Sequence, residues 1–364
     1  MEISIQLVHI HELEAFTASE KFSRMPVIPI SPQRARSHAR NPCARPDDVA
    51  LALAYADGRL VGYMGALPDM LYLRGAPQQG AWLSCLWVSP LARGKGLAKQ
   101  LTQLLLEKYG HQVLLSGFTP EAGNLYRRLG LFEEINLSDG IRGYLRPNLA
   151  HLMPPRGKFW ATIRPLLKAF DGFLSLPNAL RLQFLGTTLP CRLRYFAEAD
   201  EATGAFIAAR QLNDFTRTDL NWWLCYPWVT EAPVRDEWAE RYPFTAIARQ
   251  FSTLAMQLLD DENHLIGVLV LVQRDGHLRV PFVWLDQVHA ATVAQVIFAH
   301  ALQMRADMVT LYHPHLVAYC QQHPTPFFWK RLIQRTFFFA KPLAEQLGGQ
   351  VIDMQDGVGD LGFT

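Results

Sequence analysis

Two stretches of the chain show the same succession of short apolar runs and amphipathic segments. In the first, apolar and β-branched runs flank Asp57-Gly58, a pair that favours the positive φ angles of a tight hairpin turn. A third apolar run covers residues 81–88, and from Leu97 onward leucines recur at helical spacing. A short apolar strand and a second helix, which stops at Gly130, complete the order β-β-β-α-β-α. This order predicts a mixed sheet with a crossover helix.

The second stretch begins after Arg192 and repeats this order. Residues 251–286 have the pattern of three strands joined by two polar turns, and a helix is expected from Ala290 to Met304. A short strand, a helix and a last strand follow. The two stretches share little residue identity, so the repeat rests on the order of the elements. The predicted fold class is α/β (α+β), with two mixed β-sheets flanked by helices.

Residues 151–190 interrupt this pattern and divide the chain into three parts. Apolar residues are mixed there with cations, and Pro165 and Pro177 break the helical period. The composition predicts a connector with one or two amphipathic helices, and a helix lying on a membrane surface is the alternative. We therefore expect a first domain at 1–150, the connector, and a second domain at 191–364.

Composition narrows the setting and the partners. A chain of 364 residues exceeds one ordinary core, and 49% hydrophobic with 19% charged residues fits a compact soluble protein. A formal charge of +2 with dispersed cations predicts no nucleic-acid partner. Five widely spaced cysteines predict neither a disulfide framework nor a zinc site, and they favour a reducing compartment. Without a signal-peptide pattern or a long apolar run, the expectation is a cytoplasmic protein with no membrane span.

The turn between the third strand and its helix carries the clearest chemistry. Residues 93–98 read Arg-Gly-Lys-Gly-Leu-Ala, and the amides at a helix start have no partner within the helix. The glycines let a bulky anion approach, while Arg93, Lys95 and the helix dipole add positive charge. A P-loop needs four residues between its glycines, and a dinucleotide-binding turn needs glycine where Lys99 stands. The pattern therefore predicts a pyrophosphate site of another kind.

The stretch WVSPLARGKGLAKQL resembles the GNAT superfamily of acyl-CoA-dependent N-acetyltransferases, in which Arg-x-x-Gly-x-Ala follows a strand ending in Val-x-Pro. The stretch NLYRRLGLFEE, Asn124 to Glu134, is similar to the family's later helix-to-strand segment. The resemblance covers residues 1–147. It implies transfer of an acetyl or other acyl group from acetyl-CoA to a primary amine of a small-molecule acceptor, without a metal. The repeated element order then implies a tandem protein whose second half is a degenerate GNAT-like unit.

The resemblance also implies roles for individual residues. Tyr126 would be the catalytic residue, lying near the sulfur and protonating the leaving thiolate. A bulge in the strand before the turn would aim the Val88 N–H at the thioester carbonyl. The residues expected to bind acetyl-CoA are Leu86, Trp87 and Val88 along the pantetheine arm, Arg93, Gly94, Lys95, Gly96, Leu97 and Ala98 at the pyrophosphate, and Asn124 on the arm.

One departure from the family leaves the proton acceptor open. Many members have a carboxylate on the strand before the turn, where this chain has Ser84 and Cys85. The base is then Asp69 or a water chain, although an exposed loop position is the simpler expectation for Asp69. Cys85 is either an acyl carrier or, more simply, inert packing. A non-catalytic acyl-CoA sensor therefore remains an alternative function.

The second half bears on function in fewer places. Paired GNAT-like halves also resemble the Fem family of peptidoglycan aminoacyltransferases, but those generally lack a good CoA turn, so acyl-CoA is the better donor. The aromatic residues of 221–229 either line a pocket or pack in a core. His313 and His315 have no third metal ligand nearby in sequence. Without a glycine-rich turn, the second half is expected to complete a substrate cleft or to form a homodimer.

Overall fold

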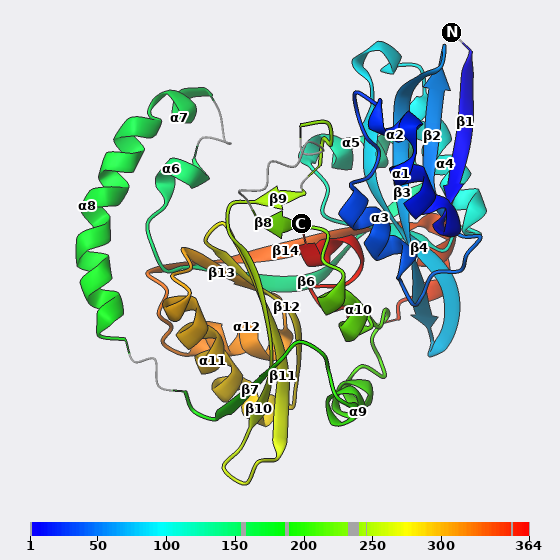
Figure 1. Ribbon diagram of the computed structural model, residues 1–364. Coiled ribbons are helices and arrows are strands. Elements are labelled where there is room, and N and C mark those ends of the chain that lie inside the picture. Colours follow the sequence, from blue (N-terminus) through cyan, green and yellow to red (C-terminus); the bar gives the residue numbers. More distant parts are fainter. Residues whose placement is uncertain are drawn as a thin grey trace. The chain divides into compact units, whose positions relative to one another are not determined.

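The chain is seen in a computed structural model that describes residues 2–153, 158–185, 189–231, 240–244, 246–350 and 352–363 (Figure 1). Contacts between residues divide it into two compact units, each built from separate stretches of sequence. The domain boundaries expected at residues 150 and 190 remain a prediction. Unit 1 comprises Met1–Leu137, Ala197–Phe251 and Arg335–Thr364, and unit 2 comprises Ser138–Phe196 and Ser252–Gln334.

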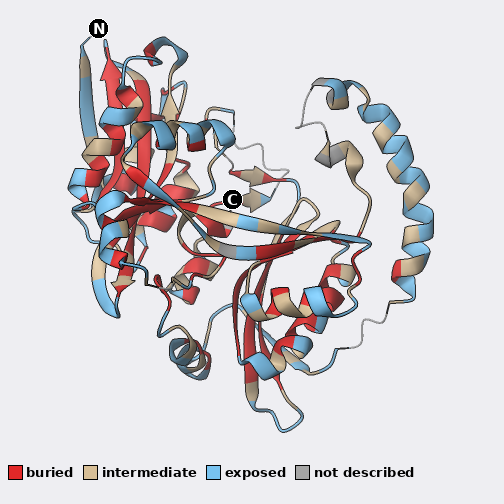
Figure 2. Cartoon of the chain, turned by 180° about the vertical axis from the view of Figure 1, so that it is seen from behind, coloured by how far each residue is buried: buried red, intermediate tan, exposed pale blue. Residues whose placement is uncertain are grey.

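The sheet of unit 1 begins with an antiparallel meander. The Asp57-Gly58 turn has φ angles of +49° and +73°, which confirms the predicted hairpin. Every residue of the second strand is buried, because helices and neighbouring strands cover it on all sides. Figure 2 shows the same concentration of buried residues along the strands. The strands of this meander are β1 (Ile3–His9), β2 (Val49–Ala56), β3 (Arg59–Leu73) and β4 (Ala76–Val88).

The expected crossover follows, but the next strand of the sheet comes from the end of the chain. β5 runs parallel to β4, as a crossover helix requires. On its other edge β5 pairs antiparallel with β14, through Phe338 and Leu115, and β6 lies beyond β14. The elements concerned are α4 (Leu97–Lys108), β5 (Val113–Leu115), α5 (Pro120–Leu129), β6 (Phe132–Tyr144) and β14 (Trp329–Ala340).

Short helices and a small second sheet complete unit 1. α3 begins where the Ser31 hydroxyl accepts the backbone N–H of Arg34 at 3.2 Å, with proline in its first turn. The remaining elements are α1 (Leu13–Ala18), α2 (Glu20–Ser23), α3 (Pro32–Ala39), α9 (Glu201–Arg210), α10 (Leu220–Cys225), α13 (Lys341–Leu347), the strand pair β8 (Thr230–Glu231) and β9 (Ile247–Ala248), and the 3-10 helices η1 (Ile10–Glu12), η2 (Pro90–Ala92) and η5 (Gly359–Phe363).

Unit 2 repeats the order of the first half, as the sequence predicted. Three antiparallel strands lead through a helix to β13, which is parallel to β12. The neighbour of β13 is β6, the last strand of the first half, so the two halves have exchanged their final strands. The elements are β7 (Arg192–Phe196), β10 (Phe251–Leu259), β11 (Leu265–Arg274), β12 (His277–Leu285), η4 (Gln287–His289), α11 (Ala290–Gln303), β13 (Met308–Leu311) and α12 (Pro314–Gln322).

The connector is helical, and its long helix does not stop at the internal proline. Pro165 occupies the first turn, where a missing N–H costs nothing, and the helix continues through Pro177. Parts of the connector, at 154–157 and 186–188, lie outside the described residues. In the part of the chain that is described, each helix is too short or too polar to cross a bilayer. The connector helices are α6 (Leu149–Leu152), α7 (Lys158–Thr162) and α8 (Arg164–Gln183).

Candidate active site

β4 changes its register against β3 at one point. Ser84 and Trp87 each pair with a residue of β3, and Cys85 and Leu86 between them together face a single residue. Cys85 has a φ of +53°, a conformation that side chains with a Cβ rarely adopt. This is a β-bulge, which bends a strand and redirects its backbone groups. The expected bulge is therefore present, and it lies two residues before Val88.

Beyond the bulge, one edge of β4 is left without a strand partner. β4 pairs with β5 only at Ala81 and Trp82. Among the described residues, no other strand pairs with β4 on this side between Ser84 and Val88. Cys85, Leu86, Trp87 and Val88 are all half-buried, whereas the paired part of the strand is buried. An unpaired strand edge offers a row of N–H and C=O groups to an extended ligand.

The glycine-rich turn at the start of α4 is open to solvent. Gly94 and Gly96 have φ angles of +77° and +75°, and a Cβ on either would meet nothing within 4 Å. Gly96 is the N-cap, so no side chain caps the first amides of α4. Gly62 of β3 makes room for Leu97, since a Cβ there would lie 2.8 Å from its side chain. In the order of the sequence, Arg93, Gly94, Lys95 and Gly96 are exposed, Leu97 is buried and Ala98 is half-buried.

Tyr126 lies inside the unit, on the buried side of α5. Its ring packs edge-on against Phe132 and near Phe338, and 4% of the residue is exposed. Burial raises the pKa of the Tyr126 hydroxyl, and the nearby Cys85 thiol raises it further. The hydroxyl has no hydrogen-bond partner among the described residues. Burial therefore keeps the Tyr126 hydroxyl protonated.

Asn124 lies on the other side of the same helix. It is exposed, and its Oδ1 accepts from Arg127 Nη1 at 3.1 Å. Arg127 is itself held by the two carboxylate oxygens of Glu134 at 2.6 and 2.8 Å. Residues two apart on a helix do not share a face. The structure thus buries Tyr126 and leaves Asn124 exposed.

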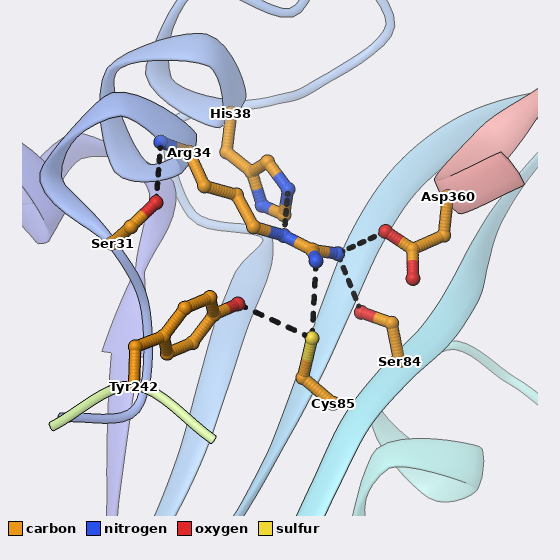
Figure 3. Close-up of polar contacts among 7 residues, drawn as sticks. All are labelled: Ser31, Arg34, His38, Ser84, Cys85, Tyr242 and Asp360. Carbon is orange, nitrogen blue, oxygen red and sulfur yellow. Dashed lines mark hydrogen bonds and ion pairs between the residues drawn. The ribbon is translucent and has the colours of Figure 1, made fainter. Parts of the chain in front are cut away.

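A buried arginine that sequence reasoning missed contacts the bulge from α3 (Figure 3). Arg34 Nη1 donates to Cys85 Sγ at 3.0 Å, and Nη2 donates to Ser84 Oγ at 2.9 Å. Nη2 also pairs with the carboxylate of Asp360 in η5. The side chains of Arg34 and Asp360 are only 5% and 16% exposed. β4 has no carboxylate of its own. The carboxylate of Asp360 lies beside Ser84 of this strand instead, through their shared contact with Arg34.

Two further groups complete the cluster in Figure 3. Arg34 Nε donates to His38 Nε2 at 3.3 Å, and the Tyr242 hydroxyl lies 3.4 Å from Cys85 Sγ. Burial, followed by the Arg34 charge, holds the pKa of His38 well below its usual value, so the imidazole is neutral and accepts. Burial raises the pKa of Cys85 although Arg34 opposes this. A protonated, half-buried thiol fits packing better than acyl transfer.

The position of Asp69 differs from the expectation. It is a buried residue of β3, not an exposed loop residue, and it accepts from Trp82 Nε1 at 2.7 Å and from the Met70 amide at 2.8 Å. Burial raises its pKa to about 6. Asp69 pairs with Gly80, four residues before Ser84 on β4. At about 3.3 Å per strand residue that is roughly 13 Å, too far to take a proton at the bulge.

The aromatic segment 221–229 and the histidines His313 and His315 lie in surroundings that indicate a structural role. Trp223 and Trp228 are 1% and 2% exposed, which fits the core alternative, and the Arg34 guanidinium lies 5.2 Å from the Trp228 ring. Burial, with a contribution from His315, lowers the pKa of His313 to about 4. Within the described ranges, no group of three or more His, Cys, Asp or Glu side chains is placed to hold a metal ion.

Unit 2 retains the strand irregularity but not the accessible edge. Its register shift between β11 and β12 leaves Val280 and Pro281 facing one residue, as at the bulge of β4. Every residue of β12 from Leu278 to Leu285 is buried, and α11 begins at Ala290, after the N-cap His289, without a glycine turn. The two halves therefore share a backbone plan. In the described part of the chain, the stretch of β12 beyond its pairing with β13 is buried, whereas the unpaired stretch of β4 is half-buried and leads to a glycine-rich turn.

The chain resembles known proteins in one stretch of its sequence and in its fold. The sequence model of the acetyltransferase (GNAT) family matches residues 10–131. No curated protein matches the chain by sequence. A GCN5-related N-acetyltransferase from Anabaena variabilis shares the fold at a TM-score of 0.50 and 14% identity, covering 93% of this chain and 72% of its own.

Two further solved structures share the fold. A probable N-acyltransferase of unknown function from Enterococcus faecalis has a TM-score of 0.53 and 12% identity, over 94% of this chain and 74% of its own. The N-myristoyltransferase of Saccharomyces cerevisiae, solved with bound myristoyl-CoA, has a TM-score of 0.51 and 8% identity, over 93% and 82%. At these identities the likeness concerns the fold, and both matches extend over nearly the whole chain.

Proposed function

We propose that the chain transfers an acetyl or other acyl group from acyl-CoA to a primary amine, because residues 10–131 match the model of the GNAT acetyltransferase family. The donor is acetyl-CoA in the simplest case, and the acceptor is a small molecule or another amino-group carrier. The observation that carries the proposal is the unpaired edge of β4 from Ser84 to Val88, which runs from the bulge toward the uncapped start of α4.

The residues of this region fit an extended thioester ending in a pyrophosphate. Leu86, Trp87 and Val88 offer backbone groups for the amides of a pantetheine arm. Space without neighbours in front of Gly94 and Gly96 leaves room for phosphate oxygens at the first amides of α4. Arg93 and Lys95 add positive charge at the same exposed turn, and Asn124 is assigned to the arm as an exposed amide.

The chain's own residues supply the proton transfers. Tyr126 donates its hydroxyl proton to the departing thiolate, and its raised pKa means that the phenol is protonated when the thiolate forms. The Val88 N–H stabilises the charge that develops on the thioester oxygen. Asp360 takes the proton of the attacking amine, directly or through water. Burial raises the pKa of this carboxyl, although Arg34 opposes the shift, and a carboxylate of higher pKa is a better base.

Amine-dependent release of CoA thiol tests the proposal. The full chain is incubated with acetyl-CoA and a panel of primary amines, and the thiol is followed by a chromogenic disulfide reagent. At least one amine should raise the rate well above hydrolysis, and Asp360→Asn should lower that rate about a hundredfold. Tight binding of acetyl-CoA with no turnover on any amine would instead favour a non-catalytic acyl-CoA sensor. An aminoacyl transferase of the Fem type would show no binding at all.

A further inference from the structure

α8 presents a row of large apolar side chains to solvent. Their exposed fractions lie between 51% and 87%, and they recur every three or four residues, which places them on one side of the helix. Figure 2 shows the exposed residues along this helix. Proteins that remain single in water rarely expose so continuous an apolar surface. This apolar face consists of Leu166 (70% exposed), Phe170 (51%), Phe173 (74%), Leu176 (72%) and Leu180 (58%), and of Phe184 (87%), the C-cap residue of the helix.

The opposite side of α8 is the one that contacts the rest of unit 2. Asp171 accepts the backbone N–H groups that begin α6, at 2.9 and 2.8 Å, and Asn178 Nδ2 donates to the Leu145 carbonyl at 2.8 Å. Leu182 is 9% exposed and belongs to the core of the unit. These contacts fix the rotation of the helix about its axis. The apolar face is therefore directed away from the residues that hold α8 in place.

The charge of this stretch of sequence is mostly of one sign. From residue 151 to residue 196 the sequence has one acidic residue, Asp171, which is engaged with α6. Arg164 and Lys168 are exposed on α8 itself, off the apolar face. An apolar face on a helix with a cationic polar face is the pattern of helices that lie in the interface of an anionic membrane. The cations of this stretch are Arg156, Lys158, Arg164, Lys168, Arg181, Arg192 and Arg194.

We propose that α8 binds the surface of an anionic phospholipid bilayer, with its apolar face in the headgroup region and its axis in the plane of the membrane. A second copy of the chain fits less well, because it would bring together two stretches that each have a net positive charge. The bilayer also needs no complementary groove, since acyl chains adapt to six protruding side chains. The inference is independent of the acyl transfer proposed above.

Flotation of the full chain with vesicles tests this. We expect it to float with phosphatidylcholine vesicles containing phosphatidylglycerol, and to do so much less with phosphatidylcholine alone. Raising the salt from about 0.05 to about 0.5 M should weaken the association. Phe173→Gln with Leu176→Gln should lower the partition coefficient about thirtyfold, and Lys168→Gln about fivefold.

A matched pair of substitutions elsewhere in unit 2 controls for non-specific hydrophobic binding to vesicles. Val288→Gln with Leu332→Gln replaces residues that are 80% and 61% exposed, and it should leave flotation unchanged. Circular dichroism confirms that both double variants are folded. The proposal is overturned if the wild-type chain does not float with anionic vesicles. It is also overturned if the Phe173→Gln, Leu176→Gln variant floats as well as the Val288→Gln, Leu332→Gln variant. A concentration-dependent dimer in sedimentation velocity that Phe173→Gln with Leu176→Gln abolishes would assign the face to a second copy instead.

Discussion

Arg34 and Asp360, 326 residues apart in sequence, form a buried ion pair against the bulge of β4. The same guanidinium donates to Ser84 and Cys85, on either side of the point where the register changes. Burial opposes the positive charge, yet the Asp360 carboxylate and the neighbouring polar groups raise the pKa of Arg34 above its usual value. The bulge that redirects the backbone of β4 is thus held by Arg34, which Asp360 in turn binds.

Removing either partner of this pair should destabilise the protein strongly. Arg34→Met and Asp360→Leu should each lower the free energy of unfolding by about 3–5 kcal/mol, because each leaves a buried charge uncompensated. The double variant should lose less than the sum of the two. Urea denaturation gives all three values. Arg24→Met, in an ion pair whose side chains are 77% and 76% exposed, is the control and should cost under about 1 kcal/mol. Strict additivity would show that the two residues are not coupled.

The sequence could not reveal this cluster. Ser31-Pro32 is a recognisable helix start, but α3 has the polar composition of an exposed helix, and yet Arg34 and His38 are buried. The burial of Arg34 and His38 depends on partners that are distant in sequence. The local hydrophobic periodicity of α3 therefore could not predict it. The missing carboxylate of β4 raised the question of a base, and only the tertiary fold shows which acid lies beside Ser84.

The stability of the protein should depend on pH through Asp69. Burial raises its pKa from an ordinary 3.8 to about 6, so the folded chain holds this proton more tightly than the unfolded chain. That contribution is fully present below pH 3.8 and is lost as the pH rises through 6, by about 3 kcal/mol. Asp69→Asn should remove this part of the pH dependence, as measured by urea unfolding at a series of pH values.

Asp47→Asn provides the comparison, since the Asp47 side chain is 95% exposed. It should follow the wild-type curve. If Asp69→Asn also follows the wild-type curve between pH 4 and pH 6, the carboxyl is not buried as described.

Tyr126→Phe should separate chemistry from binding. The hydroxyl has no described partner, so its removal costs little stability, but the thiolate loses its proton donor. We expect kcat to fall about a hundredfold while the affinity for acetyl-CoA is kept. Tyr55→Phe is the comparison, because Tyr55 is another buried tyrosine and its hydroxyl has no partner in the described part of the chain. Equal kcat values for the two variants would remove Tyr126 from the reaction.

The order of the elements followed from the hydrophobic pattern, and the pairing of the last strands did not. The hairpin at Asp57-Gly58 and the crossover through α4 depend on residues that are close in sequence. Phe338 of β14 pairs with Leu115 of β5, whereas β6, which directly follows α5, pairs with β13. Either strand has the apolar residues for either place, so the choice depends on how the whole chain closes. Composition predicted a connector helix, but it did not predict that Pro177 would lie within it.

Titration calorimetry of acetyl-CoA into the Gly96→Trp variant tests the central claim most directly. The indole would occupy the space in front of the first amides of α4. This space is empty, since a Cβ at Gly96 would have no neighbouring atom within 4 Å. Gly58→Trp carries the same backbone strain, since Gly58 has a φ of +73° and equally open surroundings, at a turn away from the bulge. We predict that the wild-type chain and Gly58→Trp bind acetyl-CoA with equal affinity and that Gly96→Trp shows no binding. Unchanged affinity in a folded Gly96→Trp variant would contradict the account.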